Sequence, residues 1–250
     1  MTAREYYARR SIEDPYFSDR LANPYRSTVA FEAFLLQYGF FSNILKDKLI
    51  FDVACGTGSE TAYFATHHSH LNFVGVDLED RFIDAANARF SIVSNATFRQ
   101  GDLYELNKLP EWVAAQAVWI SQTLSFLPWW EEELHSLIGP NIDRIAFSIL
   151  AWDGEAQSEV IHHFGQRGKD ESLAVNYNVL SLPRIKERMA QLGFNHFEIV
   201  PFEIDIDLAP PSDSGLGSYT LRTVSGRRLT FSMWQNLPWH FCLFSRHSLD

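Results

Sequence analysis

The chain has 250 residues, of which 46% are hydrophobic and 21% are charged, a balance typical of folded domains that excludes disordered, collagen-like and coiled-coil proteins. Its formal net charge is −10 and it has no Lys/Arg-rich block, so it lacks the cationic surface that binding of duplex nucleic acid requires. The two cysteines, Cys55 and Cys242, match no metal or disulfide spacing, which fits a reducing compartment, and we expect a cytoplasmic protein.

The segment 112–130 is free of charged residues and is long enough to span a bilayer. Its polar residues, among them Gln116, Gln122 and Pro128, would be left without partners in lipid. The segment therefore predicts a buried strand, a loop and the start of a helix, and we expect no membrane partner.

After a helix predicted at 27–41, with Ser27 as its N-cap, strand-like and helical patterns alternate along the chain. The predicted strands are 49–54, 71–76, 97–100, 115–120 and 144–150, and the predicted helices between them are 57–67, 79–90 and 129–137. Alternation of this kind, with strands that are apolar throughout, predicts a mostly parallel, doubly wound α/β sheet covered by helices on both faces. All strands of such a sheet place their C-terminal ends on one edge.

The last hundred residues have a different pattern. We predict helices at 152–164 and 182–192, a strand with one solvated face at 202–208, a hairpin around Gly226 and a final strand at 239–244. No linker interrupts the chain, so we predict a single domain of 1–250. Its parts would be an N-terminal helical arm or lid (1–45), a cofactor-binding core (46–150), and substrate-side helices with antiparallel strands (151–250).

The segment from Asp52 to Gly58 lies where the first strand turns into a helix. Small residues there allow a ligand to approach the backbone, and the helix start offers unpaired N–H groups. Glycines also occur in such turns for steric reasons alone. The next three strands, however, end in Asp77, in Gly101–Leu103 and in Ser121–Thr123, so four neighbouring strand ends carry residues that can bind a ligand.

A carboxylate at the end of the second strand suits the ribose of two cofactors, a nicotinamide dinucleotide or S-adenosylmethionine. The dinucleotide fingerprint has a third glycine where this chain has Thr61, and Asp52 would repel a pyrophosphate. S-adenosylmethionine has no phosphate and carries an ammonium and a sulfonium. The charges therefore favour S-adenosylmethionine, with NAD as the alternative.

These segments resemble, in order and spacing, the four successive motifs of the class I S-adenosylmethionine-dependent methyltransferases, which have a Rossmann-like fold. The resemblance covers about 45–150 and implies a three-layer α/β/α domain with C-terminal antiparallel strands. One departure is Ala54, where many members have glycine. The resemblance implies that Asp52, Ala54, Cys55, Gly56 and Gly58 surround the methionine part, Asp77 the ribose, Leu78, Asp102 and Leu103 the adenine, and Ser121 and Gln122 the sulfonium and the substrate.

The residues after the fourth strand also narrow the chemistry. The Asn/Asp-Pro-Pro-aromatic stretch of many enzymes that methylate amide or exocyclic nitrogens is missing. Ser121 and Gln122 are poor ligands for Mg²⁺, so we expect no metal. We interpret the acidic row Glu203, Asp205 and Asp207 as the solvated face of a strand rather than a Ca²⁺ site.

We therefore predict a metal-independent methyltransferase that acts on a small molecule, at oxygen in preference to nitrogen or carbon. A hydroxyl acceptor needs a general base, and the candidates are Tyr16 and His163, ahead of His162 and His240. The alternatives are an NAD-dependent oxidoreductase and a non-catalytic S-adenosylmethionine-binding module. The oligomeric state stays open, with the predicted hairpin as a contact in a homodimer.

Overall fold

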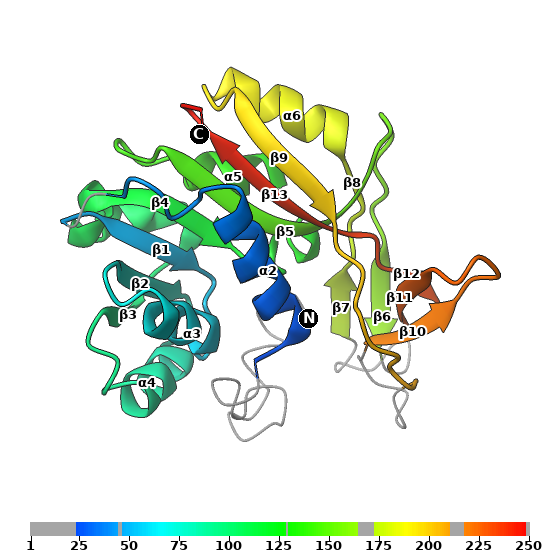
Figure 1. Ribbon diagram of the computed structural model, residues 1–250, viewed down its shortest axis with the longest axis horizontal. Coiled ribbons are helices and arrows are strands. Elements are labelled where there is room, and N and C mark those ends of the chain that lie inside the picture. Colours follow the sequence, from blue (N-terminus) through cyan, green and yellow to red (C-terminus); the bar gives the residue numbers. More distant parts are fainter. Residues whose placement is uncertain (1–23, 45–46, 129, 165–172, 211–217, 249–250) are drawn as a thin grey trace.

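The computed structural model describes residues 24–44, 47–128, 130–164, 173–210 and 218–248 (Figure 1). At its centre lies an eight-stranded sheet with the order β3-β2-β1-β4-β5-β13-β9, in which β8 pairs with β5. The strands are β1 (Leu49–Val53), β2 (Asn72–Asp77), β3 (Ala96–Gln100), β4 (Ala115–Ile120), β5 (Arg144–Trp152), β8 (Leu180–Ser181), β9 (His196–Pro201) and β13 (Trp239–Ser245). Strands β1 to β5 are parallel, and β13 runs antiparallel to both β5 and β9. The predicted fold class is confirmed.

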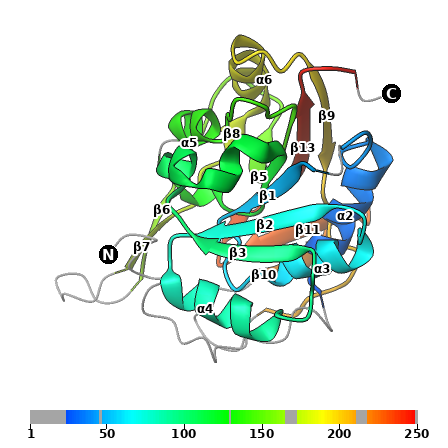
Figure 2. The same cartoon turned by 90° about the vertical axis from the view of Figure 1, so that its left-hand side faces the viewer.

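Helices cover both faces of this sheet (Figure 2). The α-helices are α2 (Arg26–Gln37), α3 (Ser59–His67), α4 (Asp80–Arg89), α5 (Trp130–Ser136) and α6 (Leu182–Gln191). Three short 3₁₀ helices are η1 (Leu103–Lys108), η2 (Pro110–Ala114) and η3 (Leu124–Phe126). Helices α2 and α3 lie on one side of the sheet, and α5 and α6 lie on the other, which gives the three layers expected from the sequence.

Two hydrophobic cores follow from the alternation of side chains along the strands. Successive residues of a strand point to opposite faces. In β1, Ile50 belongs to the same buried cluster as Phe64 of α3, whereas Phe51 belongs to the cluster that contains Leu134 of α5. The core beneath α2 and α3 is rich in aromatic rings, and Trp119 of β4 lies 5.0 Å from the Phe64 ring between centroids. This packing fixes the register of β1 and β4, whose C-terminal ends carry the predicted motifs.

The connection order places a crevice at the edge of the sheet. From β1 the chain continues to β2 and β3 on one side, and then crosses to β4 and β5 on the other side of β1. The loops after β1 and β4 therefore leave the sheet in opposite directions. Ligands of doubly wound folds bind at this point, outside the carboxyl ends of the strands.

Two small antiparallel sheets accompany the central one. Strand β6 (Ile161–Phe164) pairs with β7 (Leu173–Asn176), and β11 (Arg228–Ser232) lies between β10 (Ser218–Arg222) and β12 (Gln235–Asn236). The predicted hairpin is present as β10 and β11, and Gly226 in its turn has φ +84°. Among the described residues, no helix has the length and apolar character needed to cross a bilayer.

The helix predicted at 152–164 is wrong. Strand β5 continues to Trp152, and 161–164 form β6 instead. Ile161 is exposed and the next residue, His162, is buried, which is the alternation of a strand and not the period of a helix.

The strand predicted at 202–208 is also wrong, although its alternation of exposure is real. The ladder between β9 and β13 ends at Pro201, and Phe202 donates one more hydrogen bond to the carbonyl of Trp239. Beyond this bond the segment forms no strand ladder in the described part of the chain, and its contact with β10 is made at Leu208, whose carbonyl accepts the Thr220 N–H at 3.1 Å. Its acidic residues form ion pairs with arginines, namely Glu203 with Arg227, Asp205 with Arg26, and Asp207 with Arg222 and Arg228.

Candidate functional site

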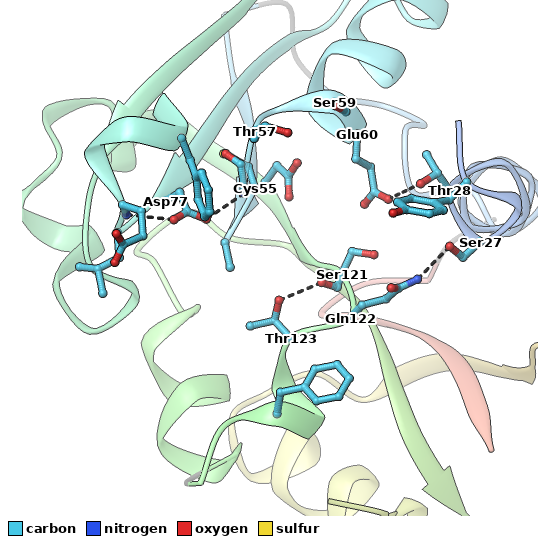
Figure 3. A pocket seen from close by; sticks show the side chains of 18 of the residues that line it. Ser27, Thr28, Cys55, Thr57, Ser59, Glu60, Asp77, Ser121, Gln122 and Thr123 are labelled. Atoms are coloured by element: carbon cyan, nitrogen blue, oxygen red, sulfur yellow. Dashed lines mark hydrogen bonds between the residues drawn. The ribbon is translucent and has the colours of Figure 1, made fainter. Parts of the chain in front are cut away.

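A cavity opens at the C-terminal ends of β1 and β4, where the topology predicts a crevice. Four segments form its wall, namely the start of α2, the loop from β1 into α3, the end of β2, and the loop after β4. The predicted cofactor residues that line it are Asp52, Ala54, Cys55, Gly56, Asp77, Leu78, Ser121 and Gln122. Figure 3 shows the labelled side chains of this wall, with Asp77 at one end and Glu60 at the other.

The loop after β1 has an unusual backbone. Ala54, Gly56 and Gly58 all have left-handed φ angles, of +60°, +55° and +74°. This region favours glycine because it brings a side-chain Cβ too close to the backbone. The position of Ala54, where many class I methyltransferases have glycine, is thus one at which alanine holds a strained conformation beside the cavity.

Gly58 has a second constraint. A Cβ built on it would lie 2.4 Å from Phe98 Cε1 and 2.9 Å from Ala86 Cβ, so a side chain has no room there. Gly58 lets α3 begin close to β3 and α4, and it does not belong to the cavity wall. Asp102 and Leu103 also lie outside that wall. The Asp102 carboxylate accepts the backbone N–H of Tyr104 at 3.0 Å and caps η1.

Asp77 connects the ends of β1 and β2. Its Oδ2 accepts the Gly56 backbone N–H at 2.8 Å, and its Oδ1 accepts the Glu79 N–H at 3.0 Å. A carboxylate offers about four acceptor positions, so each oxygen keeps one for a ligand hydroxyl. Burial raises the pKa of Asp77, and the backbone N–H groups of Glu79, Gly56 and Leu78 oppose that rise.

The opposite end of the cavity contains two further carboxylates. Asp52 is buried, and its Oδ2 accepts the Thr61 hydroxyl at 2.6 Å. Glu60, in the first turn of α3, accepts the hydroxyl of Thr28 from α2 at 2.9 Å through Oε2 (Figure 3). Burial raises the pKa of Glu60 to about 7, and burial together with the nearby Glu60 raises that of Asp52.

Several polar atoms at this end lack a partner. Ser59 Oγ, Glu60 Oε1 and Trp119 Nε1 are shielded from solvent, and among the described residues none has a partner with hydrogen-bond geometry. The Ser121 hydroxyl and the Trp119 indole still lie near enough to Glu60 to lower its pKa. Buried polar groups in folded proteins are paired as a rule, and Ser59 and Glu60 both line the cavity, so their two unpaired atoms indicate space for a polar ligand there.

Gln122, directly after β4, ties three elements together. Its φ is +50°, its backbone N–H donates to Ser148 Oγ of β5 at 2.7 Å, and its side-chain Nε2 donates to Ser27 Oγ of α2 at 2.8 Å. The prediction of Ser27 as an N-cap is therefore wrong, because α2 begins at Arg26 after Tyr25 and the Ser27 hydroxyl faces Gln122. Strain held by surrounding hydrogen bonds is common at functional sites.

The candidate bases are placed less directly. Tyr16 lies outside the described residues, and His163 is described only by its backbone, which pairs with Ala174 in β6 and β7. His162 Nε2 lies 2.6 Å from Gln235 Oε1, and His240 Nδ1 lies 3.0 Å from the Pro238 carbonyl. Within the described part of the chain, no histidine lines the cavity.

The sequence analysis missed Glu60 and Thr28. A glutamate in the first turn of a helix is ordinarily explained by the helix dipole, so Glu60 gave no separate signal. Thr28 lies in α2, far from any motif, and only the packing of α2 against the sheet brings it to Glu60. Among the described residues, no group of three or more potential metal-ligating side chains occurs.

The sequence was compared with family models and with curated proteins. A family model described as "Methyltransferase domain" matches residues 50–140, which extend from the second residue of β1 past β4 and contain the cavity loops that follow β1, β2 and β4. A search of curated proteins finds no match.

Solved structures share the fold at low sequence identity. The N-terminal domain of EvdMO1, solved with SAH bound, is 12% identical over 88% of this chain and 80% of its own, with a TM-score of 0.50. A putative S-adenosylmethionine-dependent methyltransferase from Listeria monocytogenes is 12% identical over 88% of this chain and 100% of its own, also with a TM-score of 0.50. The match identifies a methyltransferase domain within residues 50–140, and the likeness to solved structures shows that the chain shares their fold.

Proposed function

We propose that S-adenosylmethionine lies along this cavity from Asp77 to Glu60 and that its methyl group is transferred to an oxygen of a small-molecule acceptor. The observation that carries the proposal is the charge of the wall. Asp52, Glu60 and Asp77 line the cavity, and no Lys, Arg or His does so among the described residues. This arrangement suits a ligand with a sulfonium and an ammonium.

The residues at the two ends fit the two ends of the cofactor. Asp77 has one free acceptor position on each oxygen, which matches the two hydroxyls of a ribose. Leu78 beside it offers an apolar contact for adenine, and we retain Asp102 and Leu103 as proposed members of that pocket. At the far end, Ser59 Oγ and Glu60 Oε1 are available for the amino-acid part.

The same charges argue against NAD. A dinucleotide would bring a doubly charged pyrophosphate against the loop that holds Asp52, with no cation of the described wall to offset it. The backbone N–H of Gly56, at the helix start where a phosphate would bind, donates instead to Asp77.

The acceptor side of the cavity is apolar. Phe126 and Leu127, after β4, line it, and the Phe126 ring lies 5.0 Å from Tyr177 and 6.1 Å from Trp239 between centroids. An aromatic wall of this kind suits a small ring-shaped acceptor. Bound S-adenosylmethionine supplies an electrophilic methyl group, and the chain has to align the acceptor oxygen, exclude water and remove a proton. We propose Tyr16 or His163 for the last of these tasks.

Two measurements test this function. S-adenosylmethionine should raise the melting temperature of the purified protein and NAD should not. Transfer of labelled methyl to a panel of phenols, alcohols, amines and thiols should then favour the hydroxyl compounds. A shift with NAD alone contradicts the proposal, and strong cofactor binding with no turnover over the whole panel would indicate a binding module instead. Tyr16→Phe or His163→Asn should lower kcat without weakening cofactor binding, whichever carries the base.

A further inference from the structure

A group of polar side chains outside the cavity wall joins α2 to the end of α3. Glu32 of α2 is buried, and its Oε1 lies 2.9 Å from His67 Nδ1 and 2.9 Å from His68 Nε2. One carboxylate thus accepts hydrogen bonds from two neighbouring imidazole rings. Because these three residues connect the two helices, we call Glu32, His67 and His68 the clasp.

The two histidines of the clasp differ in their surroundings. The side chain of His68 is 8% exposed, whereas that of His67 is 46% exposed. The His68 ring stacks on Phe41 at 4.2 Å between centroids. Its backbone N–H donates to the Phe64 carbonyl at 2.9 Å, and its carbonyl accepts the Leu71 N–H at 3.0 Å. His68 is therefore held in a site that water hardly reaches, and protonation would place a cation there.

Protonation of His68 should weaken the clasp. Burial lowers the pKa of His68, and the nearby Glu32 opposes this effect only in part. The other titratable groups around the clasp in the described part of the chain are His67 and His70, whose charges act in the same direction as burial, and Tyr63, whose pKa burial and Glu32 raise to about 12. The folded state thus releases a proton that His68 keeps when the clasp is open. Its contribution is fully present above pH 6.5 and is lost as the pH falls through the lowered pKa.

The far end of α2 is anchored by groups that do not titrate in this range. Arg144 of β5 donates through Nη1 to the Gly39 carbonyl at 3.0 Å and to the Phe40 carbonyl at 2.7 Å, directly after the helix. A guanidinium stays charged over the whole range in which histidines titrate. Phe34 and Leu35 are buried in the core beneath α2. Weakening of the clasp should therefore loosen the first half of α2 and leave its end in place.

The first half of α2 forms part of the cavity wall. Thr28 lies four residues before Glu32, so the two side chains lie on one face of the helix. The Thr28 hydroxyl donates to Glu60 at the start of α3, and the clasp holds the end of α3. Tyr25 and Ser27 line the cavity beside Thr28. Movement at Glu32 is thus transmitted through one helical turn to the cavity.

We propose that Glu32, His67 and His68 form an acid-sensitive clasp, which holds the first half of α2 against α3 at neutral pH and loosens it when His68 takes up a proton. The cavity is then more open under acidic conditions than under neutral ones. This inference goes beyond the proposed function, because it concerns the ligand-free protein and holds whichever ligand the cavity binds.

The experiment is hydrogen–deuterium exchange of the full chain without ligand, at pH 7.5 and at pH 5.5, with added salt because the isoelectric point is about 5.3. His68→Gln is the test variant, since it leaves the α2 sequence unchanged, retains an N–H donor and cannot be protonated. The ratio of exchange rates in α2 between wild type and variant at one pH cancels the intrinsic effect of pH. It also cancels the response of Glu60, which has the opposite sign.

We expect this ratio to rise at least about threefold from pH 7.5 to pH 5.5, because each unit of pKa difference changes the opening equilibrium by about tenfold. His135→Gln is the matched control. His135 also lies in the last turn of a helix, but that helix is α5, on the other side of the sheet. The control should leave exchange in α2 unchanged at both pH values. An equal ratio of wild type to His68→Gln at the two pH values overturns the inference.

A measurement on the wild-type protein covers the case in which His68→Gln does not fold. Followed by NMR, the His68 ring should titrate below pH 6.5, and the amide signals of the first half of α2 should change along the same curve. Titration of the ring at or above pH 6.5, or α2 signals that do not follow it, overturns the inference. Neither measurement uses a ligand, so a failure to bind S-adenosylmethionine overturns only the proposed function.

Discussion

The segment 47–128 and the segment 173–248 use strands in different ways. In the first, β1 to β4 are parallel, so residues that follow each strand meet at one edge of the sheet. In the second, β9 and β13 are antiparallel, and β10 to β12 form a separate sheet. Parallel connection turns a position after a strand into a position at the site. Antiparallel connection does not, because successive strand ends lie at opposite edges.

Individual contacts illustrate the difference. Asp77 reaches Gly56 because both follow neighbouring parallel strands, and a motif spacing can predict such a pair. His162 reaches Gln235 only because separate segments of antiparallel structure pack together. No spacing in the sequence predicts that contact. The proposed acceptor side, where the Phe126 ring contacts Tyr177 and Trp239, also depends on contacts of this second kind, so the sequence offers no motif for it.

Substitution of one glycine in each segment is the test of this comparison with the largest expected effect on stability. Gly58 in the first segment and Gly226 in the second have similar φ angles, but only Gly58 is tightly packed, since a Cβ at that position would lie 2.4 Å from Phe98 Cε1. Gly58→Ala should combine backbone strain with overpacking and lower the free energy of unfolding by about 4 kcal/mol. Gly226→Ala should lower it by about 1 kcal/mol, from strain alone. Urea unfolding of both variants measures the difference, and equal effects would contradict it.

The contributions of Glu60, in the first segment, and Asp207, in the second, to the free energy of unfolding should change with pH in opposite directions. The pKa of Glu60 is raised from 4.5 to about 7, so the folded state retains a proton that the unfolded state loses. The contribution of Glu60 to the free energy of unfolding is therefore fully present below pH 4.5, and it falls by about 3 kcal/mol as the pH rises to 7. Glu60→Gln should therefore raise the free energy of unfolding relative to the wild-type protein, and this increase, measured by urea unfolding between pH 5 and 8, should become larger with rising pH.

Asp207 provides the control for that measurement. Its hydrogen bonds to Arg228 and Arg222 lower its pKa, so its contribution is present at neutral pH and is lost as the pH falls below the ordinary aspartate range. The stability difference between Asp207→Asn and the wild-type protein should therefore shrink on acidification. If the stability difference instead grows on acidification, the prediction that these ion pairs stabilise the protein through the ionised Asp207 is wrong.

Asp77 and Asp207 also separate ligand binding from surface charge. Asp77→Ala removes the two charge-assisted hydrogen bonds that we propose Asp77 makes to a ribose, and we expect about a hundredfold weaker binding of S-adenosylmethionine by calorimetry. Asp207→Ala, which removes only exposed ion pairs, should leave that affinity unchanged. Unchanged affinity in Asp77→Ala would show that the ribose assignment is wrong.

The smallest expected effect is at Ala54. Its φ of +60° lies in the left-handed region, as does that of Gly226, but the residue there is alanine rather than glycine. Ala54→Gly relieves strain but gives more freedom to the unfolded chain, so we expect a net gain of about 0.5 kcal/mol in unfolding free energy. The affinity for S-adenosylmethionine should stay within a factor of about two. A clear loss of affinity would mean that the alanine methyl contacts the ligand directly.

Much of the parallel half followed from local patterns. Strand β4 was predicted with its observed bounds, and β1, β2 and α3 within two residues, because apolar runs and glycine turns are local signals. The helix predicted at 152–164 and the strand predicted at 202–208 failed for a common reason. Period and alternation describe which side chains are buried, and the partner that buries them is decided elsewhere in the chain.

The sequence by itself determined the order of strands and helices from β1 to β5, the strand ends that carry Asp52, Asp77 and Ser121, and the sign of the charge offered to a ligand. These depend on neighbours along the chain. Only the tertiary structure decided that Thr28 of α2 holds Glu60, that Gln122 joins α2 to β5, and that Gly58 packs against Phe98. Those contacts join residues far apart in sequence, and close packing of the folded layers is what brings them together.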